Sequence, residues 1–201
     1  MPAWHRAEIR KQTRLFSDYF NIDEVIACHE RPDGSMSKPE RRLVFERGDA
    51  AAVLLVNLDT ESVVLVHQFR VPVLIGRRRE DAATIDGWLT EAVAGAVEPN
   101  ESPSTTAIRE TMEETGYRIR APKLIGKFFS SPGGGSERIF LYYCEVRDAD
   151  RLGEGGGLED EDVKIVQMPL NDLFERLANG LIEDPKLAIG GYWLKDHIKH
   201  K

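Results

Sequence analysis

The sequence has few cysteines, no long apolar run and no excess of positive charge, and each shortage argues against a class of protein. Only Cys28 and Cys144 occur among 201 residues, which excludes a disulfide-rich scaffold; two reduced thiols are expected, with a single disulfide as the alternative. No stretch reaches the roughly 18 apolar residues of a membrane-spanning helix. The first residues lack the apolar core of a signal peptide. We therefore expect a cytoplasmic protein without a membrane partner.

The charge balance points away from nucleic acid as a partner. The formal net charge is −7, with 41% hydrophobic and 30% charged residues. An acidic chain is poorly suited to polyanions, so any phosphate ligand must be held by local basic groups or a metal. The composition suits one domain, or one domain with an appendage.

Apolar patterning predicts about eight strands and three helices, an α/β (α+β) arrangement. Residues 20–48 read as two strands around the turn at Pro32-Asp33-Gly34. The segment 71–88 is irregular and is expected to be a long loop. Further strands are expected at 51–58, 62–70, 89–97, 123–131, 138–146 and 163–170, and helices at 103–115, 171–180 and 186–199.

The helix at 103–115 carries unusual charge. Ser102 before Pro103 is typical of an N-cap, and Gly116 of the residue that ends a helix. Glu110, Glu113 and Glu114 are spaced to share one face. Carboxylates at a helix C-terminus cost about 0.3–1 kcal/mol each, and the like-charge pair adds about 0.2–0.5 kcal/mol. A solvated acidic face is the simple explanation, but a divalent cation would turn this cost into a binding site.

At this segment the chain resembles the Nudix hydrolases. Their motif G-x5-E-x7-R-E-x-x-E-E-x-G is met by Gly95, Glu101, Arg109, Glu110, Glu113, Glu114 and Gly116. Thr111 departs from the aliphatic residue that is usual there. The resemblance implies a Nudix α/β/α sandwich that hydrolyses a nucleoside diphosphate linked to another group. It implies Mg²⁺, replaceable by Mn²⁺, on Glu110, Glu114 and the carbonyl of Ala94, with Arg109 orienting the carboxylates.

Other segments resemble one branch, the nucleoside diphosphate sugar pyrophosphatases, and within it the GDP-mannose pyrophosphatases. They are "SDYF", "RRLVFERG", "VVLVHQFRVPV", "SPGGGSER" and "GGGLEDEDVKIVQMPL". The branch implies GDP-mannose hydrolysis to GMP and mannose 1-phosphate. For substrate binding, it implies that Tyr19 contacts the nucleotide, that Arg41 reaches the site from the second subunit, and that Gly95 and Ala96 touch the substrate. It further implies phosphate contacts for Arg70 and Lys186, and sugar or terminal phosphate contacts for Glu137 and Asp160. Glu161 is implied as a metal ligand, and Glu161 or Glu113 as the general base.

Each of these residues also has a simpler interpretation, and the function has alternatives. Tyr19 suits a core tyrosine, Arg70 a solvated strand end, and the acidic run at 159–162 a solvated loop. The glycines before that run predict a mobile loop. ADP-ribose hydrolysis is the nearest alternative function. A non-catalytic Nudix-fold sensor, or a hydrolase of RNA caps or mutagenic nucleotides, is a lesser one.

The N-terminal strands have no obvious partner in a Nudix core. An isolated hairpin is marginally stable. We therefore expect residues 1–47 to form a β-hairpin extension that pairs two chains as a homodimer, and residues 48–201 to form the Nudix hydrolase domain.

Overall fold

The computed structural model describes residues 6–79, 86–157 and 162–199. These residues belong to two compact units. Unit 1 contains residues 1–49 and 128–138, and unit 2 contains residues 50–127 and 139–201. The Nudix motif lies entirely in unit 2.

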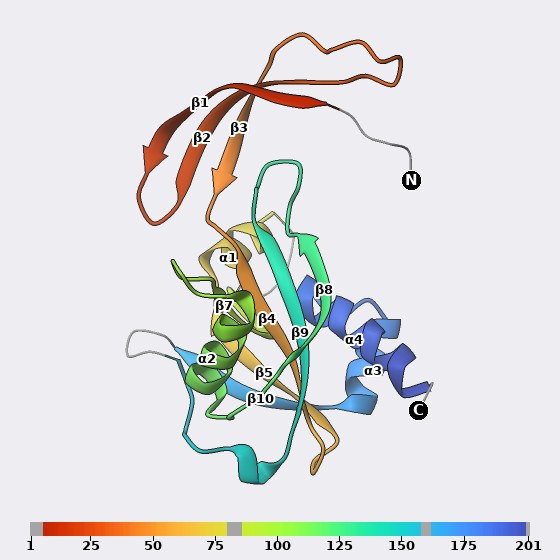
Figure 1. Cartoon of the computed structure of the whole chain (residues 1–201). Coiled ribbons are helices and arrows are strands. Elements are labelled where there is room, and N and C mark those ends of the chain that lie inside the picture. The colour runs from red at the N-terminus through yellow and green to blue at the C-terminus, as the bar shows by residue number, and fades with distance from the viewer. Residues whose placement is uncertain (1–5, 80–85, 158–161, 200–201) are drawn as a thin grey trace. The chain divides into compact units, whose positions relative to one another are not determined.

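Unit 1 is built on a three-stranded antiparallel sheet rather than a hairpin. Its strands are β1 (Ala7–Ser17), β2 (Asn21–His29) and β3 (Glu40–Glu46), in that spatial order (Figure 1). The loop after β8 joins the end of β3, where the amide of Phe45 donates to the carbonyl of Gly134 at 2.8 Å. The sequence did not predict β1, because all but one of its residues are exposed and it lacks the apolar alternation of a half-buried strand.

Unit 2 is built on a seven-stranded mixed sheet. Its main path runs β10 (Val163–Pro169), β5 (Ser62–Phe69), β4 (Ala50–Asn57), β9 (Arg138–Val146) and β8 (Lys123–Phe129). β4 and β9 are parallel, whereas β5 is antiparallel to β4 and to β10. Two short strands complete the sheet, β6 (Trp88–Glu91) beside β5 and β7 (Val93–Ala96) beside β4.

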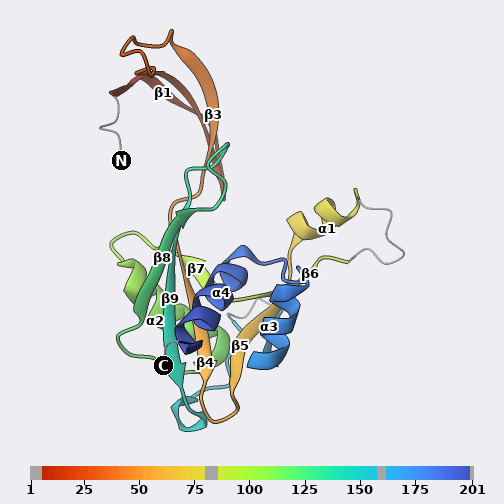
Figure 2. The same cartoon turned by 90° about the vertical axis from the view of Figure 1, so that its right-hand side faces the viewer.

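Helices cover both faces of this sheet (Figures 1 and 2). α2 (Pro103–Thr115) packs through Ala107 on Val53 and Val64. α3 (Leu170–Ala178) and α4 (Pro185–Lys199) cover the opposite face, where Leu173 and Leu187 join the cluster of Leu54 and Leu65. Successive residues of a strand point to opposite faces, so the unbroken apolar runs of β4 and β5 serve both layers. The predicted α/β/α sandwich is confirmed.

Two elements differ from the sequence prediction. The expected loop at 71–88 contains α1 (Val71–Arg77), a helix of only seven residues with none buried, which is too short for its apolar residues to establish a helical period. The expected strand at 89–97 is interrupted at Ala92, where the chain passes from β5 to β4 as its partner. A short 3₁₀ turn, η1 (Asp148–Asp150), follows β9.

Cys28 and Cys144 are free thiols. In the described part of the chain no helix is long and apolar enough to span a bilayer.

Candidate active site

α2 begins and ends where its sequence signals place it. Ser102 is the N-cap, and its hydroxyl accepts a hydrogen bond from the amide of Thr105 at 3.2 Å. Gly116 follows the last turn in the left-handed region, with φ of 73°, and its amide donates to the carbonyl of Met112 at 2.9 Å. Glycine adopts this conformation without strain. The predicted bounds 103–115 are confirmed.

The acidic face of α2 lies against β7. Oε2 of Glu114 accepts a hydrogen bond from the amide of Ala94 at 3.2 Å. The carboxylate of Glu110 lies over Gly95, where an added Cβ would come within 1.8 Å of its Oε1. The side chains of Glu110 and Glu114 are only 15% and 5% exposed. Two carboxylates are therefore held near the strand whose backbone the Nudix resemblance assigns to the metal.

Arg109 neutralises much of this charge. Its Nε and Nη2 donate to the two oxygens of Glu101, at 3.1 and 3.0 Å. Its Nη1 donates to Glu110 at 2.7 Å and to Glu113 at 2.9 Å. A planar guanidinium suits such bidentate pairing. One arginine thus holds three carboxylates in a fixed relation to one another.

Glu101 is a carboxylate of the motif with a lowered pKa. Hydrogen bonds from Arg109 and from the hydroxyl of Thr106 stabilise its charged form and lower its pKa from 4.5 to about 2. The same contacts, with those to Glu110 and Glu113, raise the pKa of Arg109, so the pair stays ionised. Glu101 therefore fixes the side chain that orients the other carboxylates.

The glycine-rich segment after η1 caps the C-terminal end of α2. The amide of Gly156 donates to the carbonyl of Glu114 at 2.9 Å, and that of Gly157 to the carbonyl of Glu113 at 3.1 Å. These donors satisfy carbonyls that the end of a helix leaves unpaired and offset part of the local negative potential. The prediction that these glycines serve loop mobility is therefore incomplete, because they also anchor the segment to the helix.

Thr111, the departure from the Nudix motif, is accommodated beneath the helix. It is fully buried, and its hydroxyl donates to the carbonyl of Ala107 at 2.7 Å. The polar group is thus satisfied within α2.

Arg70 and Lys186 meet on a carboxylate that the sequence analysis did not single out. Glu91, at the end of β6, accepts from Arg70 Nε at 2.7 Å and from Lys186 Nζ at 3.1 Å. Burial disfavours the charge of Glu91, but the two cations outweigh it and hold its pKa below the ordinary value. Burial likewise disfavours the Lys186 ammonium, but Asp184 and Glu91 outweigh it and raise its pKa.

Asp184 is a second residue that the sequence analysis missed. Its Oδ2 accepts from the amides of Ala92 at 2.9 Å and Leu187 at 3.2 Å, and its Oδ1 from Lys186 Nζ at 2.7 Å. It therefore joins the start of α4 to the break between β6 and β7. Asp184 before Pro185 has the same form as the N-cap at Ser102-Pro103, and that signal was available in the sequence.

The remaining predicted residues lie elsewhere. Tyr19 is 85% exposed at the turn between β1 and β2. It is therefore not a core tyrosine. Arg41 pairs with Glu24 on β2, and Glu137 pairs with Arg47 at 3.0 Å. These three belong to unit 1. Asp160 and Glu161 lie outside the described residues.

The donor set of α2 fits a hard divalent cation. In the described ranges, no group of three or more His, Cys, Asp or Glu side chains is arranged so that it could hold a metal ion by itself. Glu110 and Glu114 nevertheless offer carboxylate oxygens from adjacent turns, beside a strand whose glycine leaves space for them. Oxygen donors of this kind suit Mg²⁺ or Mn²⁺, which also take water and phosphate oxygens.

Comparisons with known proteins agree with this geometry. Residues 46–187 match the model of the NUDIX domain. Three proteins named GDP-mannose pyrophosphatase are similar to the chain over nearly its whole length. The one from Cronobacter sakazakii is 37% identical, covering 90% of this chain and 91% of its own. Those from Enterobacter sp. and Salmonella arizonae are 33% and 34% identical, covering 92% and 94% of both chains respectively.

Proposed function

The chain belongs to the NUDIX family, and from that premise we propose that it hydrolyses the pyrophosphate bond of GDP-mannose, giving GMP and mannose 1-phosphate. The observation that carries the proposal is the pair of carboxylates Glu110 and Glu114 held against β7. Full-length similarity to proteins named for this activity supports the choice of substrate.

Glu110 and Glu114, with the carbonyl of Ala94, would hold the cation, for which we propose Mg²⁺ with Mn²⁺ as a substitute. When bound, such an ion neutralises pyrophosphate charge and lowers the pKa of a bound water. Arg109 would act as a positioning residue, since its contacts are all to Glu101, Glu110, Glu113 and the carbonyl of Ala96. Gly95 and Ala96 would border the bound substrate.

The proton of the attacking water needs an acceptor. Glu113 is a candidate, with its side chain 31% exposed and 2.9 Å from Arg109. Glu161, in the part of the chain that the structure does not describe, is the second candidate and a proposed metal ligand.

Arg70 and Lys186 would receive the phosphates. Their shared partner Glu91 places the guanidinium and the ammonium on one carboxylate. The Arg70 side chain is 42% exposed, so it can also meet a ligand. Two cations fixed in this way suit the adjacent charges of a pyrophosphate. Glu137 and Asp160 are proposed for the sugar or terminal phosphate.

We further propose a homodimer formed through unit 1, in which Tyr19 and Arg41 contribute to the partner's site. Four large apolar side chains on its strands are more than half exposed: Ile9, Leu15, Phe16 and Leu43. Exposed apolar surface of this extent is typical of association surfaces. Burying it between two chains would stabilise a sheet that has little core of its own.

A substrate panel tests the proposed reaction. The chain should hydrolyse GDP-mannose with Mg²⁺, and chromatography should show GMP and mannose 1-phosphate in equal amounts. ADP-ribose, the nearest alternative, should be cleaved with a lower kcat/KM. A higher kcat/KM for ADP-ribose would show that the proposed substrate is wrong, although pyrophosphate hydrolysis would remain the reaction. The absence of hydrolysis across the panel would favour a non-catalytic sensor.

A further inference from the structure

The side chain of Glu91 faces the α2 layer of unit 2. In the ladder between β5 and β6, Glu91 is paired with Val66, and directly paired residues of an antiparallel ladder point to the same face of the sheet. Val66 belongs to the core cluster that contains Ala107 of α2. Glu91 therefore lies on the same face of the sheet as the helix that carries the acidic motif.

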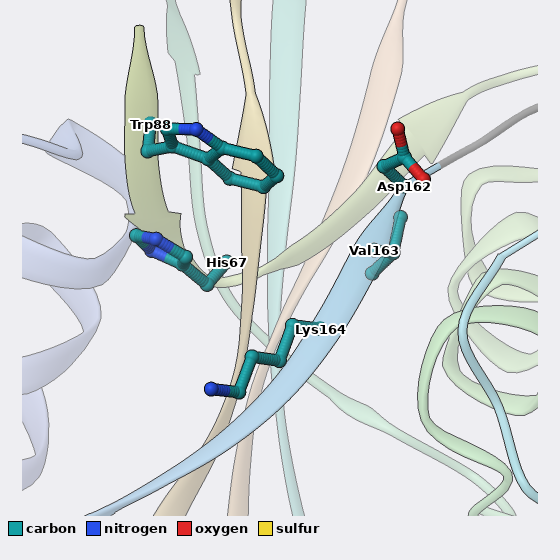
Figure 3. A pocket seen from close by; sticks show the side chains of 5 residues that line it. All are labelled: His67, Trp88, Asp162, Val163 and Lys164. Carbon is teal, nitrogen blue, oxygen red and sulfur yellow. The ribbon is translucent and has the colours of Figure 1, made fainter. Parts of the chain in front are cut away.

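The alternate residues of β6 face the other way. Successive residues of a strand point to opposite faces, so Trp88 and Thr90 point away from α2. Figure 3 shows Trp88 beside His67 of β5, at a pocket whose other side is formed by the start of β10. That pocket lies on the α3 and α4 face of the sheet. Glu91 is thus separated from it by the strand itself.

The two oxygens of Glu91 are divided between two cations. Oε1 accepts from Nε of Arg70 at 2.7 Å, and Oε2 accepts from Nζ of Lys186 at 3.1 Å. The side chains of Glu91 and Lys186 are only 6% and 13% exposed, so water competes little for their contact. Because each oxygen holds one partner, the carboxylate fixes the guanidinium and the ammonium at a set separation.

Lys186 keeps one donor for a ligand. An ammonium has three N–H groups. In the described part of the chain, one of them donates to Oε2 of Glu91 and another to Oδ1 of Asp184, at 2.7 Å. Two fixed acceptors prevent the head group from rotating, so the third N–H has a defined direction. This donor can bind a phosphate oxygen.

Glu91 is also joined by a short length of backbone to the strand beside the α2 carboxylates. The next residue, Ala92, donates its amide to Asp184 at 2.9 Å. Two residues later, Ala94 donates its amide to Glu114 at 3.2 Å. Three residues of chain span at most about 11 Å. The position of Glu91 is therefore coupled to that of the proposed metal site.

We propose that Glu91 is a positioning residue, which directs Lys186 and Arg70 at the pyrophosphate and sets their place relative to the metal. The inference rests on the proposed function, and it adds a residue that touches neither substrate nor metal. The formal charges of these three residues and Asp184 cancel. Glu91 therefore weakens the attraction of the two cations for an anion while it fixes their direction, so its removal should affect binding and turnover in opposite ways.

Glu91→Gln separates the two effects. Glutamine keeps the volume, but its single acceptor oxygen can hold only one of the cations, and the cluster gains one positive charge. The kcat for GDP-mannose at saturating Mg²⁺ should fall by at least about 10-fold, because the cations lose their direction. The dissociation constant for inorganic pyrophosphate, measured by calorimetry in EDTA, should be unchanged or lower. Lys186→Met should instead raise that constant by about 10-fold or more.

A double variant shows whether Glu91 acts through Lys186. In the Lys186→Met background, Glu91→Gln should lower kcat by at most about threefold, since the group that it directs is already gone. Damage to the fold alone would lower kcat by the same factor in both backgrounds. Glu183→Gln is the matched control. Glu183 pairs with Arg77 at 2.6 Å and is 59% exposed, so its loss should leave kcat within about twofold of the wild type.

Three results would overturn the inference: an unaltered kcat in Glu91→Gln, an equal loss of kcat in both backgrounds, or pyrophosphate binding that is absent in the wild type or weakened in Glu91→Gln. If Glu91→Gln does not fold, Glu91→Asp takes its place in the kcat measurements, because its shorter side chain keeps the charge but cannot reach both cations. Failure of the proposed function would look different. In that case Lys186→Met would weaken pyrophosphate binding and Glu91→Gln would not, while GDP-mannose with Mg²⁺ gave no products.

Discussion

A methyl group on Gly95 would lie 1.8 Å from Oε1 of Glu110 and 2.0 Å from its Cδ. Gly95 has no side chain, and this is what lets the carboxylate of Glu110 lie against β7. The added Cβ would meet the end of the flexible Glu110 side chain, so Glu110 could rotate away at small cost in stability. Its carboxylate would then leave the position proposed for metal binding.

Gly95→Ala should therefore reduce kcat by about 100-fold, the loss expected for a displacement of about 1 Å in a catalytic group. The melting temperature should change little. Steady-state kinetics at saturating Mg²⁺ measures the effect. Gly76→Ala is the matched control, because an added Cβ there meets nothing within 4 Å. Near-normal turnover in Gly95→Ala would show that Glu110 need not lie on β7.

Gly155 provides a second test, at the cap of α2. Its φ is 70°, and an added Cβ would lie 2.6 Å from the backbone carbon of Thr115 and 2.7 Å from the carbonyl oxygen of Glu114. Backbone cannot move aside as a side chain can. Gly155→Ala should lower the free energy of unfolding by at least about 1–3 kcal/mol and displace the Gly156 and Gly157 amides from the helix.

Gly153→Ala is its control, since an added Cβ there would lie 3.7 Å from the nearest atom and its φ is not left-handed. Thermal unfolding and kcat should both separate the two variants, with Gly153→Ala close to the wild type. Equal behaviour of the two variants would mean that the cap does not depend on close backbone approach.

Glu101 predicts a pH dependence of stability. Its folded pKa of about 2 lies below the ordinary 4.5. The charged carboxylate therefore stabilises the fold fully above about pH 4.5, and this contribution is lost as the pH falls towards 2. Glu101→Gln removes it at neutral pH. The gap in melting temperature between wild type and Glu101→Gln should narrow as the pH is lowered from 5 to 2; a constant gap would contradict the assigned pKa shift.

The proposed homodimer makes a separate prediction. Arg41 pairs with Glu24 on the exposed sheet of unit 1. If Arg41 reaches the partner's site, Arg41→Ala should raise KM while sedimentation still shows a dimer. Arg42→Ala, a neighbouring residue paired with Glu40, is the control and should leave KM unchanged. A wild-type chain that sediments as a fully active monomer at micromolar concentration would rule out this arrangement.

Local signals decided what the sequence could predict. Both ends of α2 follow from Ser102, Pro103 and Gly116, whose effects act within one turn, and the buried strands β4 and β5 follow from unbroken apolar runs. β1 is almost wholly exposed and lacks a regular apolar alternation, and α1 has only seven residues, too few to establish a helical period. No pattern in sequence could pair Glu91 with Lys186, since 95 residues separate them and only the tertiary fold brings the start of α4 to β6.

The most direct test of the account is the hydrolysis of GDP-mannose by the wild type and by Glu114→Gln across a series of Mg²⁺ concentrations. Glutamine keeps the volume and an acceptor for the Ala94 amide, but it removes the negative charge that would bind the metal. The account predicts metal-dependent release of GMP and mannose 1-phosphate by the wild type. It predicts at least about a 100-fold lower kcat in the variant, with metal-free stability equal or slightly higher because like-charge repulsion is relieved. Near-normal turnover by Glu114→Gln at saturating Mg²⁺ would contradict the assignment of the α2 face as the metal site.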